Sequence, residues 1–583
     1  MQSTMMDRPL LLDDILERAS TQFGDVEIVT HMPDKSLHRQ TYADMVRRAK
    51  QLAQALTEAG IKHGDRVATF SWNTSAHLEA YFGIPITGAV LHTLNLRLPP
   101  DDVAWIVNHA EDRFLIIDDV LLPLYEKFAD KVNFEKIIVV PLAGKPVPDG
   151  MESYEDFLAS AEGEFVYPEK DERDACGMCY TSGTTGKPKG VVYSHRSSVL
   201  HAMAAATPDT LNLSYNDVIL PVVPMFHVNA WGLPYVSTMV GAKQVYPGPH
   251  MDAESLLNVY EGEKVNVTAG VPTIWMGIIN ALDAEPNRWK LHPEMRMTVG
   301  GSAVPEAMIR RFDKYGLTVI QAWGMTETSP LASAARLKPA IQKLSEDEQY
   351  AIRATAGMPV PFVDTRIVGD DGNPLPWNGE DMGEIQVRGP WITGSYFQLE
   401  NSEEKFTPDG WLRTGDIATI DAEGYINITD RTKDVIKSGG EWISSVQLEN
   451  TIMGHDDVAE AAVVAQADEK WGERPLAAVV LREGRELSAE DLAAYLRERM
   501  EKWMVPENYV FVDEIPRTST GKFSKLDLRK QLLDIPLMDR FVYDELNDIV
   551  YSNMSGLDIE NSEELGNFSD AANAFFSQLG KKV

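Results

Sequence analysis

Helical and strand-like hydrophobic patterns alternate along much of the chain. Tyr42 to Ala59 places apolar side chains at helical spacing, and Gly60 follows as a stop signal. Arg66 to Trp72 and Ala175 to Tyr180 are short apolar runs typical of buried strands. Because the alternation continues to Trp323, we predict a doubly wound α/β fold with ligands at the carboxyl ends of the strands.

The pattern changes twice further along the chain. From Gly357, short strands separated by turn residues predict a small β-rich subdomain. A small α+β segment follows, with its clearest helix from Leu487 to Met500. We therefore predict a large N-terminal domain (1–430), a small mobile C-terminal domain (431–533) and an acidic, aromatic extension (534–583). The extension either packs on the body or contacts a partner or second copy.

Length and charge narrow the class of protein. At 583 residues the chain exceeds one ordinary core, which indicates two or more domains. The net charge of -34 argues against nucleic acid or an anionic membrane as a partner, since both require a basic surface. No secretory start and no apolar run of about 20 residues is evident, so we expect a cytoplasmic protein without a transmembrane segment.

Cys176 and Cys179 have the C-x-x-C spacing of metal and redox motifs. A structural zinc site needs four ligands, and the sequence contains no second cysteine pair. Both cysteines also lie in a predicted strand. We interpret them as buried core thiols.

A loop rich in hydrogen-bond donors follows that strand. Three glycines, four hydroxyls and two lysines occur between Thr181 and Gly190, without an acidic residue, as a polyphosphate requires. It is not a Walker loop, because Thr181 replaces the required glycine and Pro188 follows the lysine. Taken alone it is equally consistent with a flexible surface turn. The expected phosphate-binding residues are Thr181, Ser182, Gly183, Thr184, Thr185 and Lys189.

Together with Thr326-Glu327, Gly415-Asp416, Arg431 and Lys522, this loop resembles the signature of the adenylate-forming superfamily. That superfamily contains acyl-CoA synthetases, adenylation domains of peptide synthetases and beetle luciferases. The resemblance extends from about Tyr42 to about Leu526. It implies an enzyme that uses ATP, Mg²⁺ and, in the synthetases, CoA.

The chemistry of adenylation explains the catalytic residues that this resemblance implies. Joining a carboxylate to AMP brings two anions together, and a cation between them contributes about 4 kcal/mol at ~4 Å. Lys522 matches the catalytic lysine. Thr326 matches the residue whose hydroxyl reaches the α-phosphate, and Glu327 the metal-associated glutamate. Thr184 is the second expected metal-associated residue.

The resemblance also assigns the remaining cofactor contacts. Trp323 is expected to stack on adenine, and Asp416 and Arg431 to bind the ribose. Lys433 matches the hinge about which the small domain rotates between the two half-reactions. The opposite wall of the adenine slot is expected at Gly301, Ser302 and Ala303. The pantetheine channel is expected at Gly439, Gly440 and Glu441.

The residue that follows Phe226 indicates which class of acid the enzyme accepts. Relatives that activate amino acids carry Asp there to pair with the ammonium, but this chain has His227, which argues against an amino acid. The stretch from Met225 to Trp231 resembles bacterial medium- and long-chain fatty acyl-CoA synthetases, in which the tryptophan gates the acyl tunnel. His227 and Trp231 are thus expected tunnel residues, although Trp231 could instead belong to the core. The same subgroup implies a homodimer through the N-terminal domain.

We therefore expect a Mg-ATP-dependent acyl-CoA synthetase for an apolar carboxylic acid, first a medium- or long-chain fatty acid. The alternatives are a ligase for a short methylthio-substituted or aryl acid, an adenylate-forming enzyme with another acceptor such as a carrier-protein thiol, and a non-catalytic sensor. The presence of Lys522, Glu327 and Asp416 argues against the sensor. The sequence does not reveal the tunnel floor, so the acyl chain length is left open.

Overall fold

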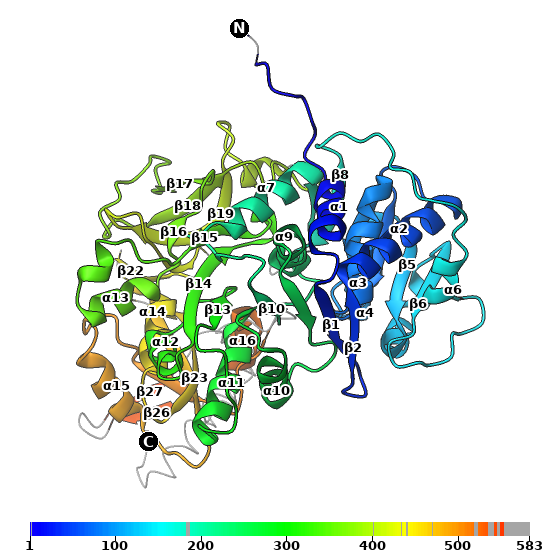
Figure 1. The fold of residues 1–583 in the computed structure, drawn as a ribbon. Helices are drawn as coiled ribbons and strands as arrows, with labels where there is room; N and C mark the ends of the chain where they lie inside the picture. The colour runs from blue at the N-terminus through cyan, green and yellow to red at the C-terminus, as the bar shows by residue number, and fades with distance from the viewer. Residues whose placement is uncertain are drawn as a thin grey trace, which may run out of the picture. The chain divides into compact units, whose positions relative to one another are not determined.

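The computed structural model describes residues 1, 3–181, 187–399, 402–432, 434–438, 441–468, 470–517, 523–533, 541–544 and 549–552. The chain forms two compact units and passes from one to the other between Ile428 and Thr429. The first unit is α/β and holds most of the secondary structure (Figure 1).

One sheet of the large unit is parallel except at one edge. Among the described residues it has seven strands, in the order β7 (Glu152–Ser153), β6 (Lys136–Val140), β5 (Asp112–Asp118), β3 (Arg66–Phe70), β4 (Val90–Thr93), β8 (Ala175–Tyr180) and β9 (Gly190–Ser194). β9 pairs with β8 in the antiparallel direction, whereas the other neighbours are parallel. The loop between β8 and β9 consequently lies at the carboxyl end of β8, where parallel sheets bind ligands.

A second sheet of the same unit has a parallel centre and antiparallel edges. In the described part of the chain its nine strands are β16 (Met358–Pro359), β15 (Leu331–Ala334), β14 (Thr318–Gly324), β13 (Arg296–Val299), β12 (Val267–Gly270), β10 (Val218–Pro221), β11 (Lys243–Tyr246), β1 (Glu27–His31) and β2 (Leu37–Thr41). The pairs from β14 to β1 are parallel. The segments that follow β10, β13 and β14 contain the expected substrate and nucleotide motifs.

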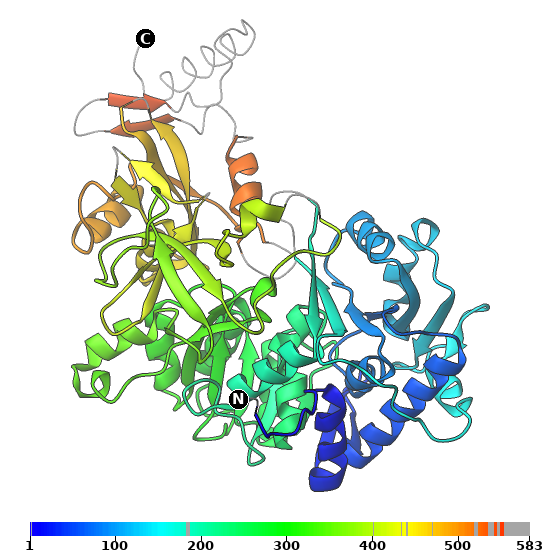
Figure 2. The same cartoon turned by 90° about the horizontal axis from the view of Figure 1, so that it is seen from above.

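Helices cover both sheets. The helices of the large unit are α1 (Leu12–Phe23), α2 (Tyr42–Glu58), α3 (Ser75–Gly83), α4 (Pro100–Ala110), α5 (Leu122–Tyr125), α6 (Tyr154–Ala159), α7 (His195–Ala206), α8 (Val228–Trp231), α9 (Leu233–Val240), α10 (Ala253–Glu263), α11 (Pro272–Ala284), α12 (Glu306–Asp313) and α13 (Glu346–Arg353). α1 and α2 lie side by side (Figure 2). α2 begins with a capping box, in which the side chains of Thr41 and Asp44 each accept the backbone N–H of the other residue.

Successive side chains of a strand point into different hydrophobic clusters on the two faces of its sheet. In β5, Phe114 and Ile116 face one hydrophobic cluster, while Leu115 and Ile117 face another on the opposite side of the sheet. The first cluster also receives side chains from α2, α3, α7 and α9, and a third cluster lies between the nine-stranded sheet and α10 to α12. Both faces of the strands are therefore buried, as expected for an α/β protein.

A small antiparallel sheet completes the large unit. Its order is β17 (Asp364–Val368), β18 (Gly383–Arg388), β19 (Leu412–Ile420) and β20 (Ile426–Arg431), and the last residues of β20 belong to the second unit. In the second unit, a sheet contains β22 (Glu441–Ile443), β21 (Ile436–Ser438), β24 (Gly472–Leu481), β23 (Val458–Asp468) and β25 (Asn508–Phe511). Its helices are α14 (Ser445–Met453), α15 (Ala489–Arg497) and α16 (Lys525–Leu533), and a hairpin joins β26 (Phe541–Asp544) to β27 (Ile549–Ser552).

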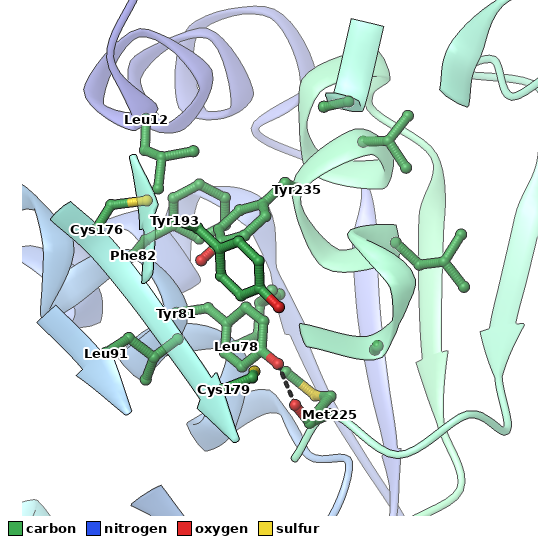
Figure 3. Close-up of a cluster of buried hydrophobic side chains, with 14 of the residues drawn as sticks. Leu12, Leu78, Tyr81, Phe82, Leu91, Cys176, Cys179, Tyr193, Met225 and Tyr235 are labelled. Atoms are coloured by element: carbon green, nitrogen blue, oxygen red, sulfur yellow. Dashed lines mark hydrogen bonds between the residues drawn. The ribbon is translucent and has the colours of Figure 1, made fainter. Parts of the chain in front are cut away.

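The α/β class with a smaller α+β unit confirms the prediction. The division of the strands between two sheets was not predicted, because hydrophobic periodicity does not reveal which strands pair. Among the described residues, no helix is both long and apolar enough to cross a membrane. Cys176 and Cys179 are buried free thiols in β8, and Figure 3 places them at different points along this strand.

Candidate active site

The loop after β8 is closed at its base by two hydrogen bonds. The Thr181 N–H donates to the Lys189 carbonyl over 2.9 Å, and the Lys189 N–H donates to the Thr181 hydroxyl over 3.1 Å. The expected phosphate-binding residues between them, Ser182, Gly183, Thr184 and Thr185, lie outside the described residues. The two ends of the loop are thus tied to each other at the carboxyl end of β8.

Helix α4 supports the same loop from one side. Its His109 Nδ1 lies 2.6 Å from the Tyr180 hydroxyl, and its Trp105 ring stacks on His109 with centroids 4.6 Å apart. The Lys187 ammonium lies 5.0 Å from the centroid of the Trp105 ring, within cation–π distance. Burial and Lys187 both lower the pKa of His109. Helix α4 thus contacts the loop at both ends, through Tyr180 and through Lys187.

Thr326 and Glu327 occupy a short turn after β14, and both are buried. The Tyr396 hydroxyl donates to Glu327 Oε1 over 2.7 Å, and the Tyr193 hydroxyl donates to the Thr326 carbonyl over 2.9 Å. The Lys189 ammonium lies 4.9 Å from the centroid of the Tyr396 ring. Tyr396 therefore contacts both Lys189, at the end of the loop after β8, and Glu327, the expected metal-associated glutamate.

Neither Tyr193 nor Tyr396 was predicted as a site residue. Burial raises the pKa of the Tyr396 phenol and the Glu327 carboxylate raises it further, so the hydroxyl stays protonated and can donate. Tyr396 lies 69 residues from Glu327 in sequence, and local periodicity carries no signal of such a contact. Its turn residues, Gly394 and Ser395, are the only nearby sequence feature that sets the segment apart.

The expected adenine and ribose residues contact each other directly. The Trp323 indole N–H donates to Asp416 Oδ2 over 3.0 Å, and Asp416 is 3% exposed. Asp416 lies on β19, where its N–H donates to the Thr414 hydroxyl over 3.1 Å. The indole bond thus fixes the aspartate carboxylate at the edge of the aromatic ring.

Trp231 lies against the expected nucleotide wall. A Cβ on Gly300 would lie 3.0 Å from Trp231 Cη2, so the indole covers this glycine at the end of β13. Gly301 and Ser302 are exposed and Ala303 is half-buried. His227 precedes the turn that carries Trp231 and is also half-buried. The expected acyl and nucleotide residues thus adjoin at Gly300.

The second unit holds the remaining predicted residues. Arg431 ends β20 and is exposed, and Glu441 begins β22. Lys433, Gly439, Gly440 and Lys522 lie outside the described residues, so their predicted roles stay predictions.

A buried lysine network, not predicted from the sequence, joins three segments of the second unit. Lys525 Nζ, at the start of α16, lies 2.8 Å from Glu449 Oε1 of α14 and 3.9 Å from Asp430 Oδ1 of β20. The Ser445 N–H donates to Asp430 Oδ2 over 2.8 Å. Burial lowers the pKa of Lys525, but the two carboxylates outweigh this effect and raise it overall.

Comparisons with known proteins identify the family of the chain. The family model described as AMP-binding enzyme matches residues 16–397, and the model described as AMP-binding enzyme C-terminal domain matches residues 447–522. The chain belongs to the AMP-binding enzyme family. This confirms the resemblance to adenylate-forming enzymes.

The curated relatives indicate which kind of AMP-binding enzyme the chain is similar to. A long-chain-fatty-acid–CoA ligase of Thermus thermophilus is 50% identical over 91% of this chain and 97% of the relative. A 3-methylmercaptopropionyl-CoA ligase of Ruegeria pomeroyi is 42% identical over 92% of this chain and 99% of the relative. A medium-chain-fatty-acid–CoA ligase of Ectopseudomonas oleovorans is 42% identical over 92% of this chain and 98% of the relative.

The fold has solved counterparts in the same class. An anthranilate CoA ligase in complex with anthranoyl-AMP superposes with a TM-score of 0.79 at 25% identity, covering 90% of this chain and 98% of that chain. Together the family and its relatives define the protein as an AMP-forming acid–thiol ligase that uses ATP and CoA.

Proposed function

We propose that the protein is a Mg-ATP-dependent acyl-CoA synthetase for medium- or long-chain fatty acids. The observation that carries this proposal is the contact of Trp231 with Gly300, which brings an apolar ring from the expected acyl path to the edge of the nucleotide site. The fatty-acid ligases among the relatives support the same substrate class. His227 offers no carboxylate for an ammonium group, which disfavours an amino acid.

The first proposed step joins the acid to AMP. A carboxylate oxygen attacks the α-phosphorus of ATP, the bond between the α- and β-phosphates breaks, and pyrophosphate leaves. Lys522 provides the cation between the two reacting anions, and the Thr326 hydroxyl contacts the α-phosphate. Tyr396 holds the Glu327 carboxylate in place. The Trp323–Asp416 bond holds the carboxylate for the ribose hydroxyls.

The second proposed step transfers the acyl group to CoA. The CoA sulfur attacks the acyl carbon, the carbon–oxygen bond to AMP breaks, and the thiol proton goes to solvent or to the AMP phosphate. In the proposal the small domain rotates about Lys433 between the steps, and residues 439–441 line the path of the thiol. Rotation would also keep water from a hydrolysable adenylate.

The residues around Glu327 fit a magnesium ion. No cluster of three or more His, Cys, Asp or Glu is present in the described part of the chain, and Mg²⁺ bound to phosphates needs few protein carboxylates. Glu327, with Thr184, would hold the ion, which when bound neutralises charge on the pyrophosphate. The Lys189 ammonium near Tyr396 supplies further positive charge in this region.

A second candidate substrate is a short thioether acid. The 42% identity to a 3-methylmercaptopropionyl-CoA ligase, over nearly the whole of both chains, favours it over other short acids. An aryl acid and a different acceptor thiol are further alternatives. We further propose a homodimer through the N-terminal domain, which light scattering after gel filtration tests directly.

The test is pyrophosphate release with Mg-ATP over straight-chain acids from three to eighteen carbons, 3-methylthiopropionate and aryl acids, each with and without CoA. We expect CoA-dependent turnover that peaks with a medium or long chain. A maximum with 3-methylthiopropionate or an aryl acid would overturn the fatty-acid proposal but keep the ligase. A parallel assay with Lys522→Ala should lose adenylate formation, and unchanged formation would contradict the role of Lys522.

A further inference from the structure

The segment that carries Trp231 has an unusual backbone. Val228, Asn229, Ala230 and Trp231 have φ values of 47°, 49°, 47° and 58°, and Gly232 follows at 70°. This left-handed turn (Val228–Trp231) is disfavoured for L-residues, and Asn tolerates it best. Consecutive residues of this kind persist only where the surroundings hold them.

Strand β8 provides one such hold. The Cys179 thiol donates to Asn229 Oδ1 over 3.1 Å, and a Cβ on Gly177 would lie 3.1 Å from Asn229 Nδ2. Gly177 and Cys179 are two residues apart and share one face of the strand. Because Gly177 has no side chain, the strand leaves room for the Asn229 amide at this point. The Cys179 thiol then fixes the orientation of that amide.

The Cys179 sulfur also lies 3.3 Å from the Thr93 hydroxyl, which donates to the Phe226 carbonyl over 3.4 Å. Burial raises the pKa of the Cys179 thiol, and hydrogen bonding from its surroundings, first of all from Thr93, opposes this effect. Cys179, Val228 and Asn229 are all nearly completely buried. A protonated thiol can donate to the amide oxygen of Asn229 while its sulfur contacts the Thr93 hydroxyl, so Cys179 is held in place and in turn holds the side chain of Asn229.

The same contact joins the two halves of the expected active site. Two residues after Cys179, the chain reaches Thr181 at the base of the loop after β8. Two residues after Asn229, it reaches Trp231, whose ring covers Gly300. Figure 3 draws Cys179 together with Met225, which lies three residues before the turn in the chain.

We propose that Cys179 and Asn229 are specificity-determining positioning residues, whose S–H···O bond fixes the left-handed turn and so places Trp231 and sets the acyl-chain preference. This inference rests on the proposed function, because it requires that Trp231 line the acyl path. Cys179 and Asn229 act through Trp231 and do not contact the substrate.

Cys176 provides a matched control. It lies on the same strand, is also buried, and has its Sγ 3.3 Å from the Ser198 hydroxyl instead of a residue of the turn. Loss of either thiol removes a similar volume from the same strand. Only loss of Cys179 removes a contact with the left-handed turn.

The experiment measures kcat/KM over straight-chain acids, KM for ATP, and thermal unfolding for Cys179→Ala, Cys179→Ser and Cys176→Ala. In Cys179→Ala we expect the ratio of kcat/KM for sixteen- and eight-carbon acids to change about fivefold, the size of one hydrogen bond. Cys179→Ser should restore the ratio because the hydroxyl can donate. Cys176→Ala should keep the wild-type ratio, and KM for ATP should stay unchanged in all three.

Equal chain-length profiles for Cys179→Ala and Cys176→Ala would overturn the inference, whatever their unfolding temperatures. If Cys179→Ala does not fold, Asn229→Gly removes the amide while its backbone tolerates the turn. A shifted profile in Asn229→Gly supports the inference, and a wild-type profile overturns it. If the wild-type enzyme uses no straight-chain acid, the proposed function fails, and the same comparison across methylthio and aryl acids of different length decides the role of the turn.

Discussion

Trp323 presents both an aromatic face and a hydrogen-bond donor to the expected nucleotide site. Its indole N–H donates to Asp416, so replacing the indole with phenyl keeps an aromatic ring but leaves a buried carboxylate without this donor. Hydrogen bonds to charged groups are worth about 1.5–3 kcal/mol, so in Trp323→Phe we expect KM for ATP to rise about tenfold or more. KM for the acid should not change. Pyrophosphate release measured against ATP concentration tests this.

Trp289→Phe is the control for that experiment. The variant loses the same kind of buried indole donor, but one that donates to the Asn258 side chain over 2.8 Å instead of to Asp416. If both variants raised KM for ATP equally, the effect would reflect general loss of packing, and the proposed role of the indole donor would be wrong.

Three buried histidines predict how stability depends on pH. Burial lowers the pKa of His77, His195 and His201 to about 4 each. In the unfolded chain they titrate near 6.5, so between these values the unfolded state binds protons that the folded state does not. Their contribution to the free energy of unfolding should therefore fall as the pH drops below about 6.5, by up to about 1.4 kcal/mol per pH unit for each histidine, whereas Asp118, whose pKa burial raises to about 7, opposes this change.

Thermal unfolding between pH 7.5 and 4.5 measures this slope. His201→Gln should lower this slope by up to about 1.4 kcal/mol per pH unit, because one group that takes up a proton on unfolding is removed. His38 is exposed, so His38→Gln should leave the slope unchanged. An identical slope in wild type and His201→Gln would show that the stability loss has another origin.

At the level of elements, Lys525 connects α16, α14 and β20 within the second unit. Lys525→Met would leave Glu449 and Asp430 buried without their cation, and breaking buried ion pairs in this way costs about 3–5 kcal/mol. We expect the unfolding temperature of the second unit to fall by several degrees. Calorimetry that resolves the transitions of the two units tests this.

Lys530→Met on the same helix is the matched control. Lys530 is 65% exposed and lies 3.3 Å from the exposed Asp527, so its loss should change the free energy of unfolding by less than about 1 kcal/mol. Equal stability of the two variants would mean that the buried network contributes no more than a surface pair.

Elements with strong local patterns could be predicted from the sequence. The predicted strand Ala175 to Tyr180 matches β8, and the predicted helix from Tyr42 matches α2, because a run of apolar residues and a capping residue define them locally. The left-handed turn was not predicted. Val228, Asn229, Ala230 and Trp231 include no glycine, and the contact that holds them comes from a strand about 50 residues earlier in the chain.

In the candidate site too, residues with a local sequence signal could be predicted and residues defined by distant contacts could not. Glu327 and Asp416 could be identified because each lies in a short motif with a glycine or threonine at a fixed offset. Tyr396 and Lys525 could not, since their roles arise only from contacts with residues about 70 or more positions away. The residues expected to bind a ligand thus left local signals, whereas the residues that contact and position them did not.

For the whole molecule, the net charge of -34 predicts a response to salt. Repulsion between exposed carboxylates destabilises the compact state, and ions screen it over about 10 Å at 0.1 M and about 3 Å at 1 M. The unfolding temperature should therefore rise as KCl increases from 0.05 to 1 M, most steeply at the low end. A fall in unfolding temperature as KCl increases would contradict the prediction.

The left-handed turn has a consequence for the evolution and engineering of the protein. At about 1–2 kcal/mol per residue, the three residues of the turn other than Asn229 together cost roughly 3–6 kcal/mol, a large part of the stability of many proteins. A search for thermostable variants would therefore favour glycine at Val228 or Ala230, because glycine adopts this backbone without the steric cost. Such variants would gain stability by freeing the segment that carries Trp231. Selection for heat resistance alone would thus tend to broaden the range of acids the enzyme accepts, and selection for a narrow range would keep the enzyme less stable than its fold allows.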